Sequence, residues 1–198
     1  MSKLKTELLQ KIDENIVAHK LIKKDFLEIE KAIELISKSL KKKSKIMFCG
    51  NGGSAADAQH LVAELLIRLR PKVNRHPLPA ISLAQDISTI TACGNDYDYS
   101  DIFLKTFQAL HSKDDVLLVI STSGNSKNII KVLREAKKKN IKTIGFLGSG
   151  GGISKKFCDI KIIINSNNTA RIQECHIFLG HFILEQVENK LLKKLKTI

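Results

Sequence analysis

The sequence predicts an α/β fold: a doubly wound, parallel, five-stranded sheet flanked by helices and preceded by an N-terminal helical extension. Two observations predict it. From Lys45 onward, short apolar segments alternate with longer amphipathic ones, which is the pattern of repeated strand–helix units. Four of the five short segments are nearly continuous apolar runs, as expected for strands that helices cover on both faces. With 198 residues and no low-complexity linker, residues 1–198 are expected to form one domain.

The first 43 residues have a helical period. Apolar residues recur every fourth position at Leu4, Leu8, Ile12 and Ile16. Asp25 followed by Glu28 is typical of a capping box, which predicts two helices separated near residues 20–25. The first helix lies outside the alternating pattern, so its apolar stripe needs a partner. This partner is either the domain itself or another subunit. We favour a subunit, which places residues 1–43 in an oligomer interface.

The strands and helices are expected at defined places along the rest of the chain. Strands are predicted at 46–48, 78–83, 116–121, 143–147 and 160–164. Helices are predicted at 54–69, 86–93 with a further piece to 109, 126–139, 153–157 and 170–194. Right-handed crossovers between such strands give a parallel sheet. Its ligands are expected beyond the carboxyl ends of the strands, where the turns lie.

A glycine-rich turn, 50–53, follows the first strand and opens a helix that Ser54 could cap. Gly50-x-Gly52-x-x-Ala55 fits the dinucleotide fingerprint G-x-G-x-x-G/A, but no acidic residue follows at the distance that this reading requires. The helix N-terminus suits an anion or a polar oxygen of a ligand. A tight turn that binds no ligand is the alternative.

A second turn, 121–126, is rich in hydroxyl groups and also opens a helix. Its sequence is Ser121-Thr122-Ser123-Gly124-Asn125-Ser126. Hydroxyl and backbone N–H donors at a helix N-terminus are typical of a site for a phosphate monoester. A merely polar loop is the alternative. A third turn, 148–152, is nearly all glycine, and the sequence indicates no role for it.

Two polar pairs on helices are candidates for chemistry. His60 and Glu64 lie four residues apart on one helical face, and such a pair can hold zinc or act as acid and base. Alone, such a pair is more often a simple surface pair. On the last helix, Gln173 and His181 share a face but lie about 12 Å apart along the axis. His176 falls on the apolar face of that helix and is expected in the core.

Composition limits the partners. The net charge of +13 could favour nucleic acid, but the lysines gather at helix ends and no aromatic-plus-basic stacking motif is present. We expect an anionic small molecule and no nucleic acid. No apolar run approaches the roughly 20 residues of a membrane span, and the N-terminus has no apolar signal core. We therefore expect no membrane association and, with four widely spaced cysteines, a location in the reducing cytoplasm.

Together these motifs resemble those of the phosphoheptose isomerases, a branch of the sugar isomerase (SIS) fold family. The residues that carry the resemblance are Gly50 to Ser54, His60, Glu64, Asn95, Asp96, Ser121 to Ser126, Arg171 to Glu174, and His181. The resemblance covers nearly the whole chain. It implies conversion of sedoheptulose 7-phosphate to D-glycero-D-manno-heptose 7-phosphate for bacterial surface heptose, in a homotetramer whose active sites lie between subunits.

The resemblance also implies roles for particular residues. One zinc ion per subunit would be held by His60, Glu64, Gln173 and His181, and the first three would also bind the substrate. The phosphate would bind Ser121, Thr122, Ser123 and Ser126, and the sugar would be lined by Asn51, Gly52, Gly53, Asn95 and Asp96. Moving a carbonyl from C2 to C1 passes through an enediol, so we expect Glu64 to be the base and His181 the acid/base partner. A non-enzymatic SIS-fold regulator of replication initiation, acting by protein binding, is the alternative. The intact His60, Glu64, Gln173 and His181 set argues against it.

Overall fold

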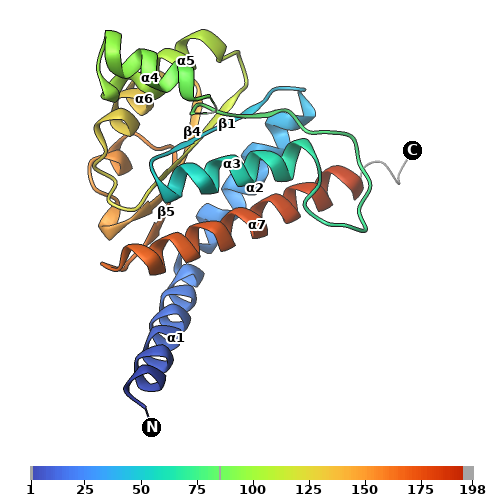
Figure 1. Cartoon of the computed structure of the whole chain (residues 1–198). Helices are drawn as coiled ribbons and strands as arrows, with labels where there is room; N and C mark the ends of the chain where they lie inside the picture. The colour runs from blue at the N-terminus through green and yellow to red at the C-terminus, as the bar shows by residue number, and fades with distance from the viewer. Residues whose placement is uncertain (1, 85, 194–198) are drawn as a thin grey trace.

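A computed structural model describes residues 2–84 and 86–193 of the chain. It consists of a twisted sheet with helices on both faces and one long N-terminal helix, α1 (Lys3–Leu21), that projects from the body (Figure 1). The N-terminal helical extension and the α/β fold class predicted from the sequence are thereby confirmed.

The sheet has five parallel strands in the order β2-β1-β3-β4-β5. Their bounds are Ile46–Gly50 for β1, Ala80–Ser82 for β2, Val116–Ser121 for β3, Lys142–Gly148 for β4 and Ile160–Ile164 for β5. The strand order reverses between β1 and β3, since β1 leads outward to β2 and β3 leads outward to β4. Parallel sheets bind ligands at such a reversal, beyond the carboxyl ends of the strands.

Two hydrophobic clusters fill the space on either side of the sheet. Successive side chains of a strand point to opposite faces, so Ile46 and Phe48 of β1 enter one cluster while Met47 and Cys49 enter the other. The first cluster includes residues of α2 (Phe26–Lys41), α3 (Gly53–Leu66) and α7 (Thr169–Lys193). The second includes residues of α4 (Ile87–Asp96), α5 (Ile102–Leu110) and α6 (Lys127–Lys138). The residues proposed for chemistry on α3 and α7 therefore share one face of the sheet.

The predicted break in the N-terminal helical region is confirmed, but the predicted capping box is wrong. A 3-10 turn, η1 (Ile22–Asp25), separates α1 from α2. The Asp25 side chain makes no capping bond. Its carboxylate instead accepts the backbone N–H of Ile163 at 3.1 Å, which fastens the start of α2 to β5.

The helix after the glycine turn begins earlier than the sequence suggested. Gly52 is the N-cap residue of α3, with φ at 56°, a left-handed value that glycine adopts readily. Ser54 is buried within the first turn, so its predicted capping role is wrong. The remaining short 3-10 turns are η2 (Tyr99–Asp101), η3 (Ser149–Gly151) and η4 (Ser154–Lys156). None of the described helices is both long and apolar enough to cross a membrane.

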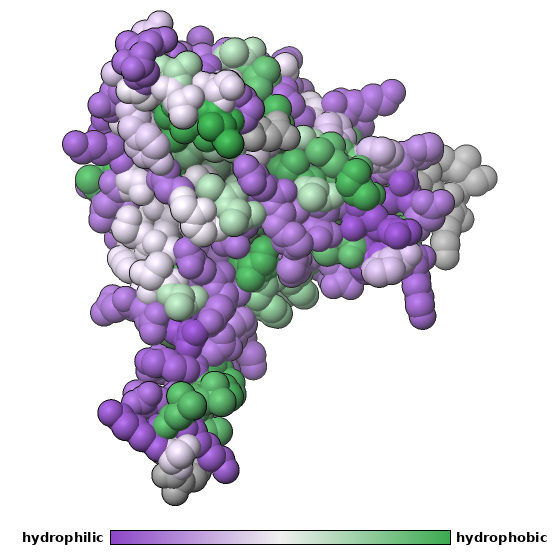
Figure 2. All heavy atoms as spheres, in the orientation of Figure 1, coloured by the Kyte–Doolittle hydropathy of each residue, from purple (hydrophilic) through white to green (hydrophobic). Residues whose placement is uncertain are grey.

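Apolar side chains remain on the outside of α1. Leu4, Leu8, Ile12 and Ile16, the predicted stripe, are all exposed, as are Leu9 and Val17. Figure 2 shows apolar groups on this projecting helix among charged ones. The stripe thus stays uncovered by the rest of the chain over the described residues.

Candidate active site

The turns after β1 and β3 are joined directly by side chains. The Asn51 amide donates to Asn128 Oδ1 at 3.0 Å, and the Asn128 amide donates back to Asn51 Oδ1 at 2.8 Å. Tyr99 donates its hydroxyl to the same Asn51 oxygen at 3.2 Å. Asn128 is 2% exposed and lies in the first turn of α6. The turn after β1 is therefore bonded to the first turn of the helix that follows the serine turn, at the strand reversal.

The hydroxyl groups of the turn after β3 accept bonds from their own backbone. Ser121 Oγ accepts the N–H of Gly124 at 3.1 Å, and Ser123 Oγ accepts the N–H of Asn125 at 3.1 Å. A serine hydroxyl that accepts can still donate its own proton. Ser126 is the N-cap residue of α6 without a side-chain capping bond. These hydroxyls can therefore donate to an anion at the N-terminus of α6.

The third turn, 148–152, which the sequence left without a role, braces the serine turn. The N–H of Ser154 donates to the Gly124 carbonyl at 2.9 Å, and the N–H of Ile153 donates to Asn125 Oδ1 at 3.0 Å. A Cβ on Gly124 would lie 2.1 Å from the Gly151 carbonyl oxygen. Glycine is required here because the two backbones touch.

The helices α3 and α7 bring together three of the residues predicted for chemistry. His60 Nε2 on α3 lies 2.8 Å from His181 Nε2 on α7, and 3.3 Å from Glu64 Oε1. One ligand atom from each of the three residues lies within 4.8 Å of the others. Gly180 permits this approach, because a Cβ there would meet Leu61 Cδ2 at 2.5 Å.

Gln173, the fourth predicted ligand, lies against the glycine turn. A Cβ on Gly53 would meet the Gln173 amide nitrogen at 2.5 Å. Gly53 therefore leaves room for this amide at the N-terminus of α3. A role of Gln173 as a metal ligand stays a prediction.

The chemistry of the three clustered residues fits a divalent cation. Glu64 Oε2 is buried, and no described residue offers it a hydrogen bond. Two imidazole nitrogens at 2.8 Å need either a shared proton or a common cation between them. Two histidines and a carboxylate are a ligand set typical of zinc sites that act in catalysis.

The family of the chain is shown by its relatives. A family model described as the SIS domain matches residues 13–148. The phosphoheptose isomerase of Campylobacter concisus is 46% identical over 81% of this chain and 84% of its own length. That of Clostridium acetobutylicum is 42% identical over 95% of this chain and 96% of its own.

The chain belongs to the phosphoheptose isomerase branch of the SIS domain family. The structure of phosphoheptose isomerase from Neisseria gonorrhoeae superimposes on it with a TM-score of 0.88 at 36% identity, covering 94% of this chain and all of that one. The resemblance read from the sequence is thus confirmed, and the reading as a replication regulator gains no support.

Two predicted sugar-lining residues of this phosphoheptose isomerase family member lie at the surface. Asn95 and Asp96 are exposed in the last turn of α4, and the Asn95 amide donates to the Asp96 carboxylate at 2.8 Å. Tyr99, three residues later, is the side chain that reaches the glycine turn. Sequence reasoning missed Tyr99, although it is one of only two tyrosines and follows Asn95-Asp96 closely.

One carboxylate beside the cluster also has an oxygen without a hydrogen-bond partner among the described residues. Asp57, one turn before His60 on α3, has a buried Oδ2 that no described residue bonds. Burial raises the pKa of Asp57, and the nearby His60 opposes that shift. Asp57 thus adds a second poorly solvated carboxyl to the polar face of α3.

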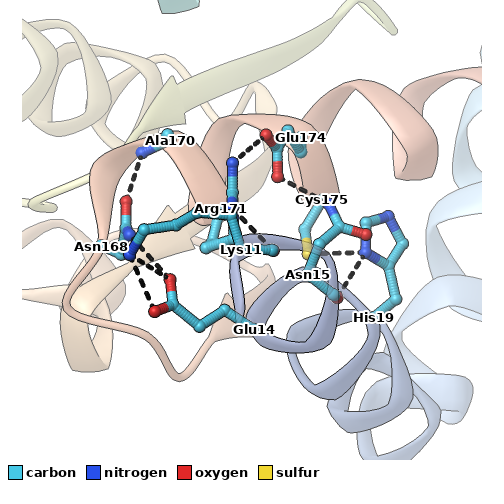
Figure 3. A network of polar contacts seen from close by, with 9 residues as sticks. All are labelled: Lys11, Glu14, Asn15, His19, Asn168, Ala170, Arg171, Glu174 and Cys175. Carbon is cyan, nitrogen blue, oxygen red and sulfur yellow. Dashed lines mark hydrogen bonds and ion pairs between the residues drawn. The ribbon is translucent and has the colours of Figure 1, made fainter. Parts of the chain in front are cut away.

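A network of polar contacts holds α1 on the first turns of α7 (Figure 3). The Arg171 guanidinium donates to the Lys11 carbonyl at 2.9 Å, and Asn15 donates to Glu174 at 2.6 Å. Asn168 accepts the N–H of Ala170 at 3.1 Å, which caps α7. The turn that carries Gln173 is therefore fixed from outside by the projecting helix.

Proposed function

We propose that this chain isomerises sedoheptulose 7-phosphate to D-glycero-D-manno-heptose 7-phosphate. The observation that carries the proposal is the cluster of His60, Glu64 and His181, whose ligand atoms lie within 4.8 Å of one another. The chain that carries this cluster matches, over most of their length, relatives that are named phosphoheptose isomerase. A regulator that acts only by binding protein would not need it.

The proposed substrate spans the strand reversal. Its phosphate accepts bonds from Ser121, Thr122, Ser123 and Ser126, and the positive end of the α6 dipole favours its charge. Asn51, Gly52, Gly53, Asn95 and Asp96 line the sugar in this proposal. The Asn51–Asn128 pair supports this placement, because it joins the two turns.

The reaction needs one proton moved between carbons and one between oxygens. Glu64 takes the proton from C1 and the C2 carbonyl becomes a hydroxyl, which gives the enediol. Glu64 then returns the proton to C2 while the C1 carbonyl forms. Its Oε2, without a bonding partner among the described residues, is suited to accept that proton. His181 carries the proton between the two oxygens.

His60, Glu64, Gln173 and His181 are the residues that would hold a zinc ion in this proposal. When bound, zinc would supply polarisation of the carbonyl or hold the side chains in order. His60 lies between Glu64 and His181 and orients both. A ligand that must also accept a proton needs a loose bond, so we assign Glu64 primarily as the base.

The proposal extends to assembly and place. We propose that residues 1–198 act as one domain in a homotetramer, with the N-terminal helices in the interface and active sites between subunits. The six exposed apolar residues of α1 support this, because exposed apolar patches of this kind mark surfaces that bind another protein. The product would feed surface heptose, in lipopolysaccharide or capsule. Four free buried cysteines are consistent with a reducing cytoplasm.

Replacing Glu64 with glutamine tests the function. Glutamine is nearly isosteric but its amide cannot take the C1 proton. Turnover of sedoheptulose 7-phosphate should fall by a factor of about 10² or more while substrate affinity is largely kept. Wash-in of solvent deuterium at C1 and C2, followed by NMR, should also stop.

The control is Asp114→Asn, an exposed carboxylate in the turn before β3 and outside the N-terminal helices, which should leave turnover unchanged. His181→Gln should allow some deuterium exchange while blocking net isomerisation. A Glu64→Gln protein that exchanges deuterium at the wild-type rate excludes Glu64 as the base. A wild-type protein that binds the sugar phosphate without converting it contradicts the proposed function.

A further inference from the structure

The loop 67–79, between α3 and β2, turns back onto the end of α3 through the side chain of Arg75 and the N–H of Leu78, which donates to the Leu65 carbonyl at 3.0 Å. Arg75 donates from its two terminal nitrogens to the Glu64 carbonyl at 2.6 Å and to the Leu65 carbonyl at 2.9 Å. The last carbonyls of a helix have no partner within the helix. Arg75 thus fixes the backbone of the residue that we assign as the base.

The same guanidinium is fixed to α7. Its Nε donates to Glu188 Oε1 at 2.6 Å, and the two side chains are 6% and 2% exposed. The other oxygen of Glu188 accepts the Nε of Arg70 at 2.6 Å. Figure 1 shows the loop passing beside the C-terminal half of α7. Arg75 therefore connects the last turn of α3 to α7 through a buried ion pair.

This connection closes one end of a seam between two adjacent helices. At the other end, Gly53 of α3 lies against Gln173 of α7, and in the middle Leu61 lies against Gly180. The His60–His181 contact lies beside the middle contact, since His60 is next to Leu61 and His181 is next to Gly180. Without Arg75, the Glu64 carbonyl would lose this donor, the Leu65 carbonyl would keep the N–H of Leu78 at 3.0 Å, and the last turn of α3 would lose its connection to Glu188.

The chemistry of this pair argues for a role other than simple stability. Burying two charges costs solvation, and apolar residues of similar shape often serve stability as well. An arginine adds a fixed geometry, because the donors of its planar guanidinium bond the two carbonyls and the carboxylate at the same time. We infer that Arg75, held by Glu188, is a positioning residue that sets Glu64 and His60 against His181. The expected effect on turnover rests on the proposed function, and the expected effect on the positions of the side chains does not.

Arg70 offers a matched control. It also bonds Glu188, but its other bonds go to Asn189 and Glu185, which like Glu188 lie on α7. Removing Arg70 therefore disturbs the same buried carboxylate without releasing the carbonyls of α3. Arg75→Lys keeps a positive charge for Glu188 but cannot bond both carbonyls and the carboxylate together. Arg75→Met with Glu188→Met removes both partners of the buried ion pair, and Arg70 then keeps its bonds to Glu185 and Asn189.

The test compares Arg75→Lys, the Arg75→Met/Glu188→Met double variant and Arg70→Met. In the first two, kcat should fall about 10- to 100-fold, the scale of a small misplacement of a catalytic group. KM for sedoheptulose 7-phosphate should change less than about threefold, because the serine turn is untouched. Arg70→Met should keep kcat within about threefold of the wild type.

The second readout needs no turnover. Ring NMR signals of His60 and His181 in metal-free protein, assigned with His60→Gln and His181→Gln, should shift in both Arg75 variants and stay in place in Arg70→Met. If the wild type lacks isomerase activity but these shifts appear, the proposed function fails and the positioning role stands. If folded Arg75 variants match Arg70→Met in both kcat and histidine signals, the positioning role is overturned.

Discussion

His176 is a titratable side chain in the core. It lies on α7 with no exposed surface, and its ring centre is 6.1 Å from that of Phe146. Burial lowers its pKa from 6.5 to about 4, and the Leu147 backbone only partly opposes this. The folded protein therefore holds His176 neutral at pH values where the unfolded chain binds a proton.

This difference predicts a pH dependence of stability. The unfolded imidazole binds its proton near pH 6.5 and the folded one near pH 4, so protons favour the unfolded chain between these values. The contribution is complete above about pH 6.5 and is lost as the pH falls towards 4. The loss approaches about 1.4 kcal/mol per pH unit. His176→Phe should flatten this part of the curve of unfolding free energy against pH, measured with urea.

The exposed His76 provides the comparison. His76→Gln removes an imidazole without changing a buried group, so its curve should run parallel to that of the wild type. Parallel curves for His176→Phe and the wild type between pH 6.5 and 4 would show that His176 does not cause the loss.

At the scale of the element, the serine turn 121–126 makes a quantitative prediction. Ser123 is exposed, and its hydroxyl proton is free to donate because its oxygen accepts from Asn125. Ser123→Ala should weaken binding of inorganic phosphate and of the sugar phosphate by roughly 1–3 kcal/mol, the cost of one charge-assisted bond. Calorimetry measures both. Ser88→Ala, at an exposed position of α4, should bind as the wild type does. Unchanged affinity in Ser123→Ala would remove this turn from the phosphate site.

The elements themselves could largely be predicted from apolar patterns. β3 and β5 begin and end where the sequence placed them, because long β-branched and aliphatic runs bounded by polar turns leave little ambiguity. β2 is only Ala80–Ser82, shorter than the predicted 78–83, because strand ends depend on pairing with β1. The capping box at Asp25 failed for the same kind of reason, since a distant N–H from Ile163 outcompeted the local one.

The candidate site could be predicted only in part. The contact of His60 with His181 was expected from family resemblance and not from spacing, because spacing gives no contact between separate helices. Asn128, Tyr99 and Arg75 were missed, because each acts through a partner far along the chain. Arg75 bonds a carboxylate 113 residues away, which a single sequence cannot indicate.

At the scale of the whole molecule, the exposed apolar stripe of α1 predicts that chains associate through this helix. Leu8 and Ile12 are 60% and 46% exposed on the projecting helix. Deleting residues 2–20 should give smaller or insoluble species by light scattering, but it would also remove the contacts of Lys11 and Asn15 with α7. Leu8→Glu with Ile12→Glu keeps those contacts and puts charge on the stripe. It should also give smaller species, because buried unpaired charges are costly.

Lys5→Glu, at an exposed and already polar position on α1, is the control and should assemble like the wild type. An active tetramer in the Leu8→Glu/Ile12→Glu protein would show that this stripe is not in the interface.

The contact between His60 and His181 joins residues 121 positions apart. Chains are made from the N-terminus, so α3 leaves the ribosome long before α7 does. Contacts of such long range also form late, because a large loop must close first. His60 is therefore synthesised before strands β2 to β5 and before its partner His181. Because α7 follows β5 in the chain, the pair can form only after all five strands have been synthesised.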